Sequence, residues 1–211
     1  MNATFFSLIV VASTVINIST EVPKSEQDFI FLKEEKNIIL SCRELKLPNN
    51  HTTRELKAEF KVFASAETIL KVLKNEQYAL RWMKGVKEFS TICKINDNDW
   101  YAYVQYRIPW PLSNQDCIIR YKCKTTENGH GYILNLNGAP EYLPTKPGVE
   151  RISQMSGCWK ITENVLNRCS VVYTVYSDQK PKYPKWATDP IIQQNLISTL
   201  SSMKELAENF Q

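Results

Sequence analysis

Hydrophobic and polar residues alternate most regularly between Asp99 and Cys123. One face of the first half would carry Trp100, Ala102, Val104, Tyr106 and Ile108, and the other Tyr101, Tyr103, Gln105 and Arg107. A period of two predicts a strand in a sheet whose two faces differ in environment. Pro109 and Pro111 then remove two backbone donors, so the ladder must stop before the strand pattern resumes at Ile118. We therefore predict a long hairpin.

Further strands and one internal helix follow from the same patterns. Strand patterns cover residues 37–44, 56–62, 86–95, 132–136, 149–161 and 169–176. Ser65 is a suitable N-cap, and Glu67 lies in the first turn, where the helix dipole favours an anion. Apolar residues then recur every three or four positions towards Trp82, which predicts one amphipathic helix after the second strand.

A long helix is predicted at the C-terminal end. Asp189 is a suitable N-cap, and Pro190 fits the first helical position, where its missing donor costs nothing. The apolar stripe of this helix comprises Ile192, Leu196, Leu200, Met203, Ala207 and Phe210. A stripe of about 18 residues is roughly 27 Å long, and the strands are the only apolar surface against which it can lie.

This order of elements predicts an α+β fold, with antiparallel strands and with helices gathered on one face. A curved sheet wrapped around the C-terminal helix would leave a space between them, and apolar ligands bind in such clefts. The strand face with Ala102, Val104 and Tyr106 is then expected to line an internal apolar cavity.

Composition fits one globular domain. The chain has 211 residues, of which 43% are hydrophobic and 23% charged, so it can hold a core and still enclose a cavity. The net charge of +4 comes from 26 basic and 22 acidic residues that are interspersed. No basic block with interleaved aromatic residues occurs, so nucleic-acid binding is not expected, whereas weak attraction to an anionic membrane is allowed.

The N-terminal segment has the pattern of an export signal. Residues 5–16 form an apolar run that is too short for a membrane span but fits the central region of a signal peptide. Residues 1–4 lack the usual basic side chains, and the alternative is an N-terminal helix docked on the domain. We expect a signal peptide over residues 1–20 with export to the periplasm or secretion, and a cytoplasmic location under the alternative.

Residues that carry chemistry are scarce. The six cysteines form no CxxC pair and have no metal-ligand spacing, so free thiols are favoured, although export would permit disulfides. His51 and His130 lie in turns, and the carboxylates of Asp97 and Asp99 fit a turn between strands. No GxSxG, HExxH or phosphate-loop motif occurs. We expect no catalytic residue, metal or cofactor, and therefore not an enzyme.

Several blocks of the sequence resemble one family in their order and spacing. They are PWPLSNQD at 109–116, RW at 81–82, GVER at 148–151, GCWKI at 157–161, the strand at 171–178 and PKW at 184–186. They resemble the START domain, the lipid-transfer module related to the steroidogenic acute regulatory protein, although the family usually has arginine in place of Gln115. The resemblance implies a helix-grip fold over residues 21–211, a tunnel for one lipid or sterol, and the C-terminal helix as its lid.

The resemblance also implies which residues line the tunnel. The family often buries an acid–arginine pair there; Arg120 matches the arginine, but the acidic partner would fall at Ala102 and is absent. Arg120 must then find another acceptor, bind a polar group of the ligand, or lie at the rim in water. The expected ligand-binding residues are Ala102, Val104, Tyr106, Ile118, Arg120, Leu196, Leu200 and Met203.

Three functions remain open at this point. The first is non-catalytic binding, transfer or sensing of a lipid or sterol-like ligand by a monomer that contacts membranes transiently. The second is a helix-grip enzyme of the cyclase or hydrolase type, which needs an acid, base or nucleophile set that the facing positions do not supply. The third is a packed interaction module without a ligand.

Overall fold

A curved sheet holds a long helix in its concave face. The computed structural model describes residues 28–47, 52–108, 113–177 and 185–210. The strands are β1 (Ile30–Glu35), β2 (Ile38–Lys46), β3 (Thr52–Val62), β4 (Val86–Asn96), β5 (Asp99–Tyr106), β6 (Asn114–Thr125), β7 (Gly131–Gly138), β8 (Val149–Arg151), β9 (Met155–Val165) and β10 (Arg168–Ser177). The helices are α1 (Ala66–Lys74), α2 (Glu76–Trp82) and α3 (Lys185–Glu208), with a 3-10 turn η1 (Pro140–Tyr142).

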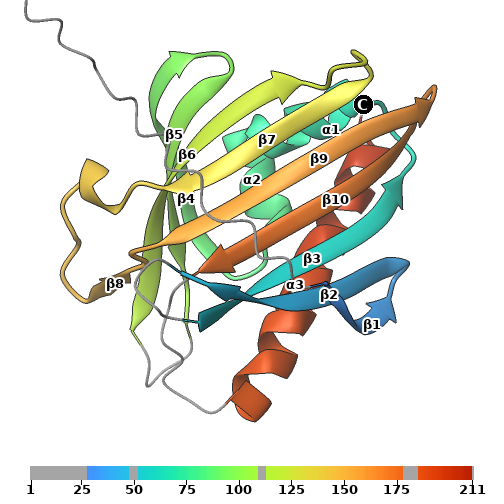
Figure 1. The fold of residues 1–211 in the computed structure, drawn as a ribbon. Helices are drawn as coiled ribbons and strands as arrows, with labels where there is room; N and C mark the ends of the chain where they lie inside the picture. The colour runs from blue at the N-terminus through green and yellow to red at the C-terminus, as the bar shows by residue number, and fades with distance from the viewer. Residues whose placement is uncertain (1–27, 48–51, 109–112, 178–184, 211) are drawn as a thin grey trace, which may run out of the picture.

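The strands form one sheet in the order β1-β2-β3-β10-β9-β7-β6-β5-β4, in which every neighbouring pair is antiparallel. The short strand β8 lies off this path and pairs parallel to β6. Figure 1 shows α3 running along the inner face, with α1 and α2 beside it on the same face. The predicted α+β, helix-grip architecture is therefore confirmed.

The predicted internal helix is in fact two helices. Asn75 stands between them, and its side-chain oxygen accepts hydrogen bonds from the backbone N–H groups of Gln77 and Tyr78. An asparagine in this role caps a new helix start, so α1 ends and α2 begins at a new angle. The predicted strand over residues 149–161 is likewise divided, because β8 pairs with β6 whereas β9 pairs with β7 and β10.

Two elements at the ends of the domain also differ from the prediction. The strand β1 was not predicted, because its sequence IFLKEE shows no alternation. The helix α3 begins at Lys185 rather than at Asp189, so Pro190 lies inside the helix. Proline at this position removes one hydrogen bond to the first turn and none to the remainder of the helix.

The helices α1 and α2 close one end of the concave face. Ser65 caps α1 as predicted, with its hydroxyl accepting a hydrogen bond of 3.1 Å from the Thr68 N–H. Ile69 and Val72 of α1 are fully buried in the core that the inner face of the sheet supplies. Full burial of one such side chain contributes about 1.5–3 kcal/mol to the free energy of folding, so these residues stabilise the packing of α1 against the sheet.

The helix α3 packs against the sheet through its C-terminal half. Its side chains there that are no more than 2% exposed are Ile197, Leu200, Met203 and Ala207. In the N-terminal half, by contrast, Trp186, Ile191 and Ile192 are between 51% and 80% exposed. The first turns of the helix extend past the lower rim of the sheet in Figure 1.

Polar contacts hold the N-terminal half of α3 to the sheet. An Arg54 Nη atom lies 2.7 Å from an Asp189 carboxylate oxygen, which joins β3 to the helix. Gln194 accepts a hydrogen bond from Lys33 and donates one to Glu35, both on β1. Partly exposed polar pairs of this kind contribute little stability each, so the two halves of α3 are anchored unequally.

The segment between β7 and β9 pairs with β6 through β8 and covers outward-facing side chains of β5, where Tyr142 stacks on Tyr101. Its strand β8 brings Arg151 to Asp116, and the guanidinium donates two hydrogen bonds of 2.6 and 3.1 Å to the carboxylate. The same guanidinium donates to the carbonyls of Pro140, Leu143 and Pro144. The buried Asp116 charge is therefore paired, and Arg151 ties this segment to the sheet.

Both edges of the sheet are irregular. The edge strand β4 has three register shifts against β5, at Val86/Glu88, Thr91/Cys93 and Lys94/Asn96. The other edge strand, β1, has one shift against β2, between Phe31 and Lys33. The internal ladder of β2 with β3 is regular over nine residue pairs. Bulges of this kind twist an edge away from a flat geometry.

Candidate functional site

Six of the eight residues expected to line the interior do face it. Ala102 and Val104 of β5 are fully buried and belong to the same core as Leu200 and Met203 of α3. Tyr106 and Leu196 pack against this core but are only partly buried. The alternation read from residues 100–106 thus assigns the two faces of β5 correctly, and α3 lies over the inner one.

The other two, Ile118 and Arg120, lie on the outer face of the sheet, so their expected place in the interior is wrong. In the β5–β6 ladder Tyr103 pairs with Ile118 and Tyr101 with Arg120, and directly paired residues share a face. Ile118 is buried there, and its carbonyl accepts a hydrogen bond from the Ala139 N–H. The residues of β6 on the inner face are instead Cys117, Ile119 and Tyr121. A face assignment that is wrong by one residue along a strand places every side chain on the opposite face, and this explains the error for Ile118 and Arg120.

Arg120 has found another acceptor, which is Asp99. The guanidinium donates hydrogen bonds of 2.9 and 2.7 Å to the two carboxylate oxygens, and it stacks 5.4 Å from the centre of the Tyr101 ring. The hydrogen bonds from Arg120 lower the pKa of the Asp99 carboxyl, and Asp99 in turn raises the pKa of Arg120. Arg120 therefore stabilises the strand ends of the hairpin on the solvent side.

Inward-facing side chains keep accessible surface at the end of the grip opposite to α1. Those that pack against the core yet are only partly buried include Leu56, Val86, Tyr106, Met155, Tyr173 and Leu196. Val86 and Met155 stand at the starts of β4 and β9, and Tyr106 stands at the end of β5. We call the side of the interior that α1 covers the closed end, and the side where α3 begins the open end.

Polar side chains also gather on the inner face of the sheet. The hydroxyls of Tyr106, Tyr121 and Tyr173 lie near the Cys117 thiol. We call these three hydroxyls, together with the thiol, the interior hydroxyl cluster. The Tyr106 hydroxyl and the Cys117 thiol are within hydrogen-bonding reach of each other. Burial raises the pKa of each tyrosine above its usual value and raises that of the Cys117 thiol to about 12, so all four groups are uncharged at neutral pH.

Aromatic contacts extend this cluster across the sheet to α2. The Tyr173 ring stacks on Trp159 with a centroid distance of 4.1 Å, and Trp159 meets Trp82 edge to face at 6.2 Å. The indole N–H of Trp82 is buried and has no hydrogen-bond partner among the described residues. A buried donor without a partner is rare in folded proteins, so this group marks a place where a polar atom could bind.

Four interior residues were not expected from the sequence patterns, namely Cys117, Tyr121, Trp159 and Tyr173. Cys117 and Tyr121 could have been found by pairing the two strands of the hairpin before assigning faces, because they stand across from Val104 and Trp100. No local signal distinguishes Tyr173 or Trp159 from core aromatics, since their contact depends on the pairing of β9 with β10.

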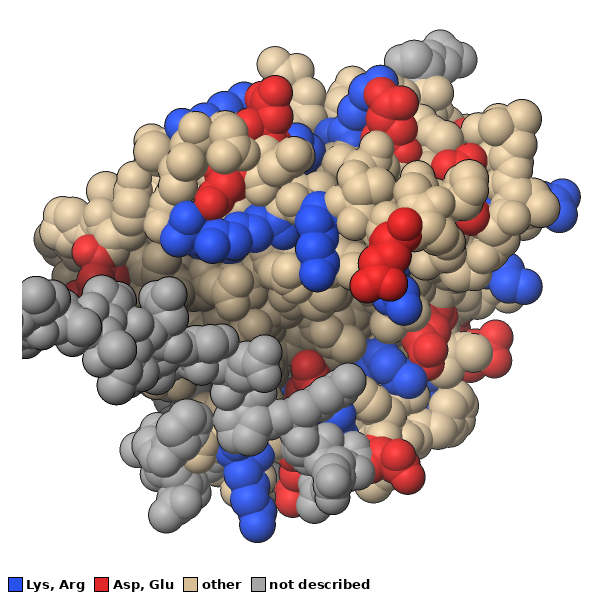
Figure 2. Space-filling view, turned by 45° about the horizontal axis from the view of Figure 1, so that its top comes forward, with Lys and Arg blue, Asp and Glu red and all other residues tan. Residues whose placement is uncertain are grey.

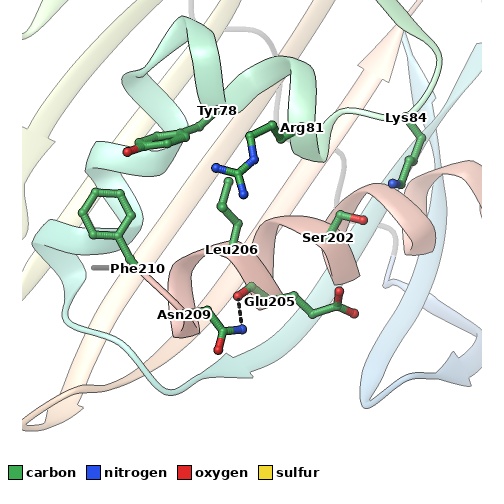
Figure 3. A pocket seen from close by; sticks show the side chains of 8 residues that line it. All are labelled: Tyr78, Arg81, Lys84, Ser202, Glu205, Leu206, Asn209 and Phe210. Atoms are coloured by element: carbon green, nitrogen blue, oxygen red, sulfur yellow. Dashed lines mark hydrogen bonds between the residues drawn. The ribbon is translucent and has the colours of Figure 1, made fainter.

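A separate cleft of about 540 Å³ lies on the outside, between α2 and the C-terminal half of α3. Figure 3 shows its walls, which are Tyr78, Arg81, Lys84, Ser202, Glu205, Leu206, Asn209 and Phe210. Tyr78 and Phe210 meet edge to face at 5.4 Å and narrow it at one end. Charged side chains of both signs line this cleft, and none of the predicted ligand-binding residues does, so it is distinct from the interior.

Other kinds of site have no support in the described part of the chain. Figure 2 shows basic and acidic side chains interspersed over one face, without a continuous basic patch. No group of three metal-ligating side chains occurs among the described residues, where all six cysteines are free and none opposes another across a strand pair. His130 is exposed in a turn, whereas His51 and the prolines at 109 and 111 lie outside the described residues. Within those residues no helix is both long and apolar enough to cross a membrane.

Comparison with known families gives the context for this geometry. The profile of the START domain matches residues 23–211. This chain belongs to the START domain family. The family resemblance read from the sequence blocks is thereby confirmed, and its helix-grip fold is the one observed.

Three relatives illustrate the range of the family. The human START domain-containing protein 10 is 29% identical over 125 residues, which are 59% of this chain but only 42% of that protein. The phosphatidylcholine transfer protein of rat is 24% identical over 160 residues, or 72% of this chain and 74% of the relative. The crystal structure of a STAR-related lipid transfer protein fragment from Xanthomonas axonopodis superposes with a TM-score of 0.75 at 22% identity and covers 86% of this chain and 99% of that one. The last likeness concerns the fold alone.

Proposed function

We propose that this protein binds one lipid or other apolar small molecule between the inner face of the sheet and α3, without catalysing a reaction on it. The observation that carries the proposal is the gradient of burial along the interior. Ile69 and Val72 of α1 are fully buried, whereas inward-facing apolar side chains at the open end, such as Leu56 and Leu196, keep accessible surface. An apolar interior reached from one end is the usual form of a site for an apolar ligand. The names of the lipid-transfer relatives support the same class of ligand.

The open end also suggests how a ligand enters. The exposed side chains of Trp186, Ile191 and Ile192 stand on the half of α3 that polar contacts hold. We infer that this half moves away from the sheet while the C-terminal half stays packed, and that a lipid passes from a membrane at that moment. The net charge of +4 is compatible with a transient contact with an anionic surface.

Catalysis is not part of the proposal. An enzyme of this fold needs an activated nucleophile or an acid–base pair in its interior. The ionisable groups of the interior hydroxyl cluster have raised pKa values, which keep the Cys117 thiol and the tyrosines protonated and therefore weakly nucleophilic. We accordingly keep the enzyme as an alternative without an observation in its favour.

Native mass spectrometry of protein incubated with lipid vesicles tests the proposal. We expect a mass increment of one lipid molecule. Leu196→Trp, which enlarges a partly buried side chain at the open end, should reduce the lipid-bound fraction at least several-fold. Asn195→Trp, at an exposed position of the same helix outside its apolar stripe, is the matched control and should leave it unchanged. A protein that takes up no lipid from any vesicle, or two variants that behave alike, would show that the interior is not a binding site.

We further propose that residues 1–20 are an export signal and that the mature chain begins near residue 21. The apolar run at residues 5–16 supports this, and it lies outside the described residues. Intact-mass measurement of protein recovered from the periplasm or medium of an expressing cell should give a chain shorter by about 20 residues. A full-length chain confined to the cytoplasm would instead support the docked N-terminal helix.

A further inference from the structure

Neutral polar side chains lie in the centre of the interior, whereas the charged side chains of Arg54 and Glu163 lie at its two ends. Arg54 lies at the open end, where it is paired with Asp189. Glu163 lies at the closed end, where it accepts hydrogen bonds from the backbone N–H groups of Ala66 and Asn167. Asp116, the one buried carboxylate among the described residues, faces the outer side and is bound by Arg151. Among the described residues, therefore, no ionised side chain faces a ligand in the middle of the interior.

Hydrogen-bond donors, by contrast, lie in the central part of the interior. Tyr106 and Tyr173 bring hydroxyls, and both side chains pack against the core without being completely covered by it. The Trp82 indole, which is connected to Tyr173 through Trp159, adds an N–H that is buried and has no partner in the described residues. Across the ladder from Tyr106 stands Gln115, whose amide is also neutral. These groups can hydrogen-bond an oxygen atom but cannot neutralise a charge.

An ionised headgroup would be unfavourable in such surroundings. A phosphate moved from water into a site without a cation loses its hydration and gains no compensating charge. A hydroxyl or carbonyl oxygen loses far less on leaving water, and the tyrosine and tryptophan donors replace its hydrogen bonds. The donor set therefore discriminates between lipids by the charge of their polar end.

We propose that the interior hydroxyl cluster, together with the Trp82 N–H, selects an uncharged lipid whose polar end is a hydroxyl or carbonyl oxygen, and excludes lipids with an ionised phosphate headgroup. This inference rests on the proposed function, because it requires that a lipid occupies the interior. It adds the chemical class of the ligand and the residues that recognise it.

A competition experiment with purified, delipidated protein tests the selection. The probes are cholesterol, oleyl alcohol, 1-octadecene, dioleoylphosphatidylcholine and dioleoylphosphatidic acid, each presented at the same mole fraction in vesicles, with bound lipid quantified by mass spectrometry. We expect cholesterol or oleyl alcohol to be bound at least about 10-fold more than either phospholipid, because a buried phosphate has no cation here.

Conservative variants then identify the donors. Tyr106→Phe, Tyr173→Phe and Trp82→Phe each remove one donor, and for an oxygen-bearing lipid at least one of them should weaken binding about 5-fold, as expected for the loss of one hydrogen bond. Binding of 1-octadecene, which has no oxygen, should change less than about 2-fold in the same variants. Tyr103→Phe, on the outer face, is the control and should alter neither affinity.

Each outcome decides a different claim. Binding of a phospholipid as tight as that of the alcohols, or unchanged alcohol binding in all three interior variants, would overturn the proposed selection while leaving the lipid-binding function intact. Failure to bind any of the five probes would overturn the lipid-binding function itself, and the selection with it.

Discussion

At the scale of single residues, one buried ion pair, Asp116 with Arg151, contributes to the stability of the domain. Asp116 is fully buried in the outer face of β6, and Arg151 reaches it from a strand 35 residues further along the chain. The pair joins residues 114–116 to residues 149–151, which are far apart in sequence and paired in the fold. Each charge compensates the other, so removing one partner alone leaves a buried charge without a counter-charge and destabilises the fold.

We expect Asp116→Asn to lower the free energy of unfolding by about 3 kcal/mol, because it leaves the Arg151 guanidinium buried without an anion. Urea denaturation at neutral pH measures this. Asp99→Asn removes the carboxylate of an accessible pair on the same face and serves as the control, with a much smaller expected loss. Equal losses in the two variants would contradict the assignment of Asp116 as the buried charge that needs its partner.

The Cys117 thiol makes stability depend on alkaline pH. Its pKa is raised to about 12 in the folded protein, by burial above all, whereas an unfolded cysteine titrates near 8.5. Its stabilising contribution is therefore complete below about pH 8.5 and is lost as the pH rises towards 12, because the unfolded chain releases the proton first. Each pH unit in that window should cost about 1.4 kcal/mol of unfolding free energy from this group.

Urea denaturation of Cys117→Ala at several pH values between 8 and 11 checks this contribution. The loss of stability with pH should be shallower in the variant than in the unaltered protein. Val104→Ala is the matched control, since Val104 faces Cys117 across the ladder and its truncation leaves a cavity without removing a titrating group. The same slope in Cys117→Ala and in the unaltered protein would show that the thiol titrates normally.

At the scale of elements, α3 is one helix with two kinds of anchorage. Its C-terminal half is fixed by fully buried apolar side chains, and its N-terminal half by the Arg54–Asp189 ion pair and the bonds of Gln194. The apolar stripe predicted from sequence is continuous along the helix, but the sheet covers only part of it. A sequence pattern shows which face of a helix is apolar and not how far the opposing surface extends.

We expect Leu200→Ala to lower the free energy of unfolding by about 2–5 kcal/mol, because it removes a fully buried side chain and leaves a cavity. Ile191→Ala, on the same helix but 62% exposed, should change it by no more than about 0.5 kcal/mol. Thermal or urea denaturation of the two variants side by side measures the difference. A large loss of unfolding free energy in Ile191→Ala would show that the first turns of α3 are packed against the sheet, contrary to this description.

At the scale of the whole molecule, the sequence predicted the architecture, the family and the part of the interior lined by β5 and α3, but not the part lined by β6, β9 and β10. Alternation along β3 and β5, the Ser65 cap and the C-terminal stripe led to the correct elements, because each is a local property. The placement of Ile118 and Arg120 failed because the face of β6 depends on its register with β5, which no local pattern specifies. The contact of Tyr173 with Trp159 depends on strand pairing over a still longer range.

The gradient of burial predicts a matching gradient of local stability. Amide hydrogen exchange should be slowest at Val62, Ile161 and Val171 on the closed side, where opening requires global unfolding. Amides of residues 191–196 in the accessible half of α3 should exchange faster than those of residues 200–207. Added lipid should slow exchange mainly in the former. Uniform protection along α3, with or without lipid, would contradict the unequal anchorage.

The bulged edges have a consequence for how this domain fails. While β1 stays in place, neither border of the sheet presents a flat row of free donors and acceptors to another chain. If heat or a mutation detaches β1, the border becomes β2, whose ladder with β3 is regular over nine residue pairs and which bears an exposed Ile39. Polymerisation by strand addition would then begin at the uncovered edge of β2. The edge strand β1 therefore protects the sheet from fibril formation.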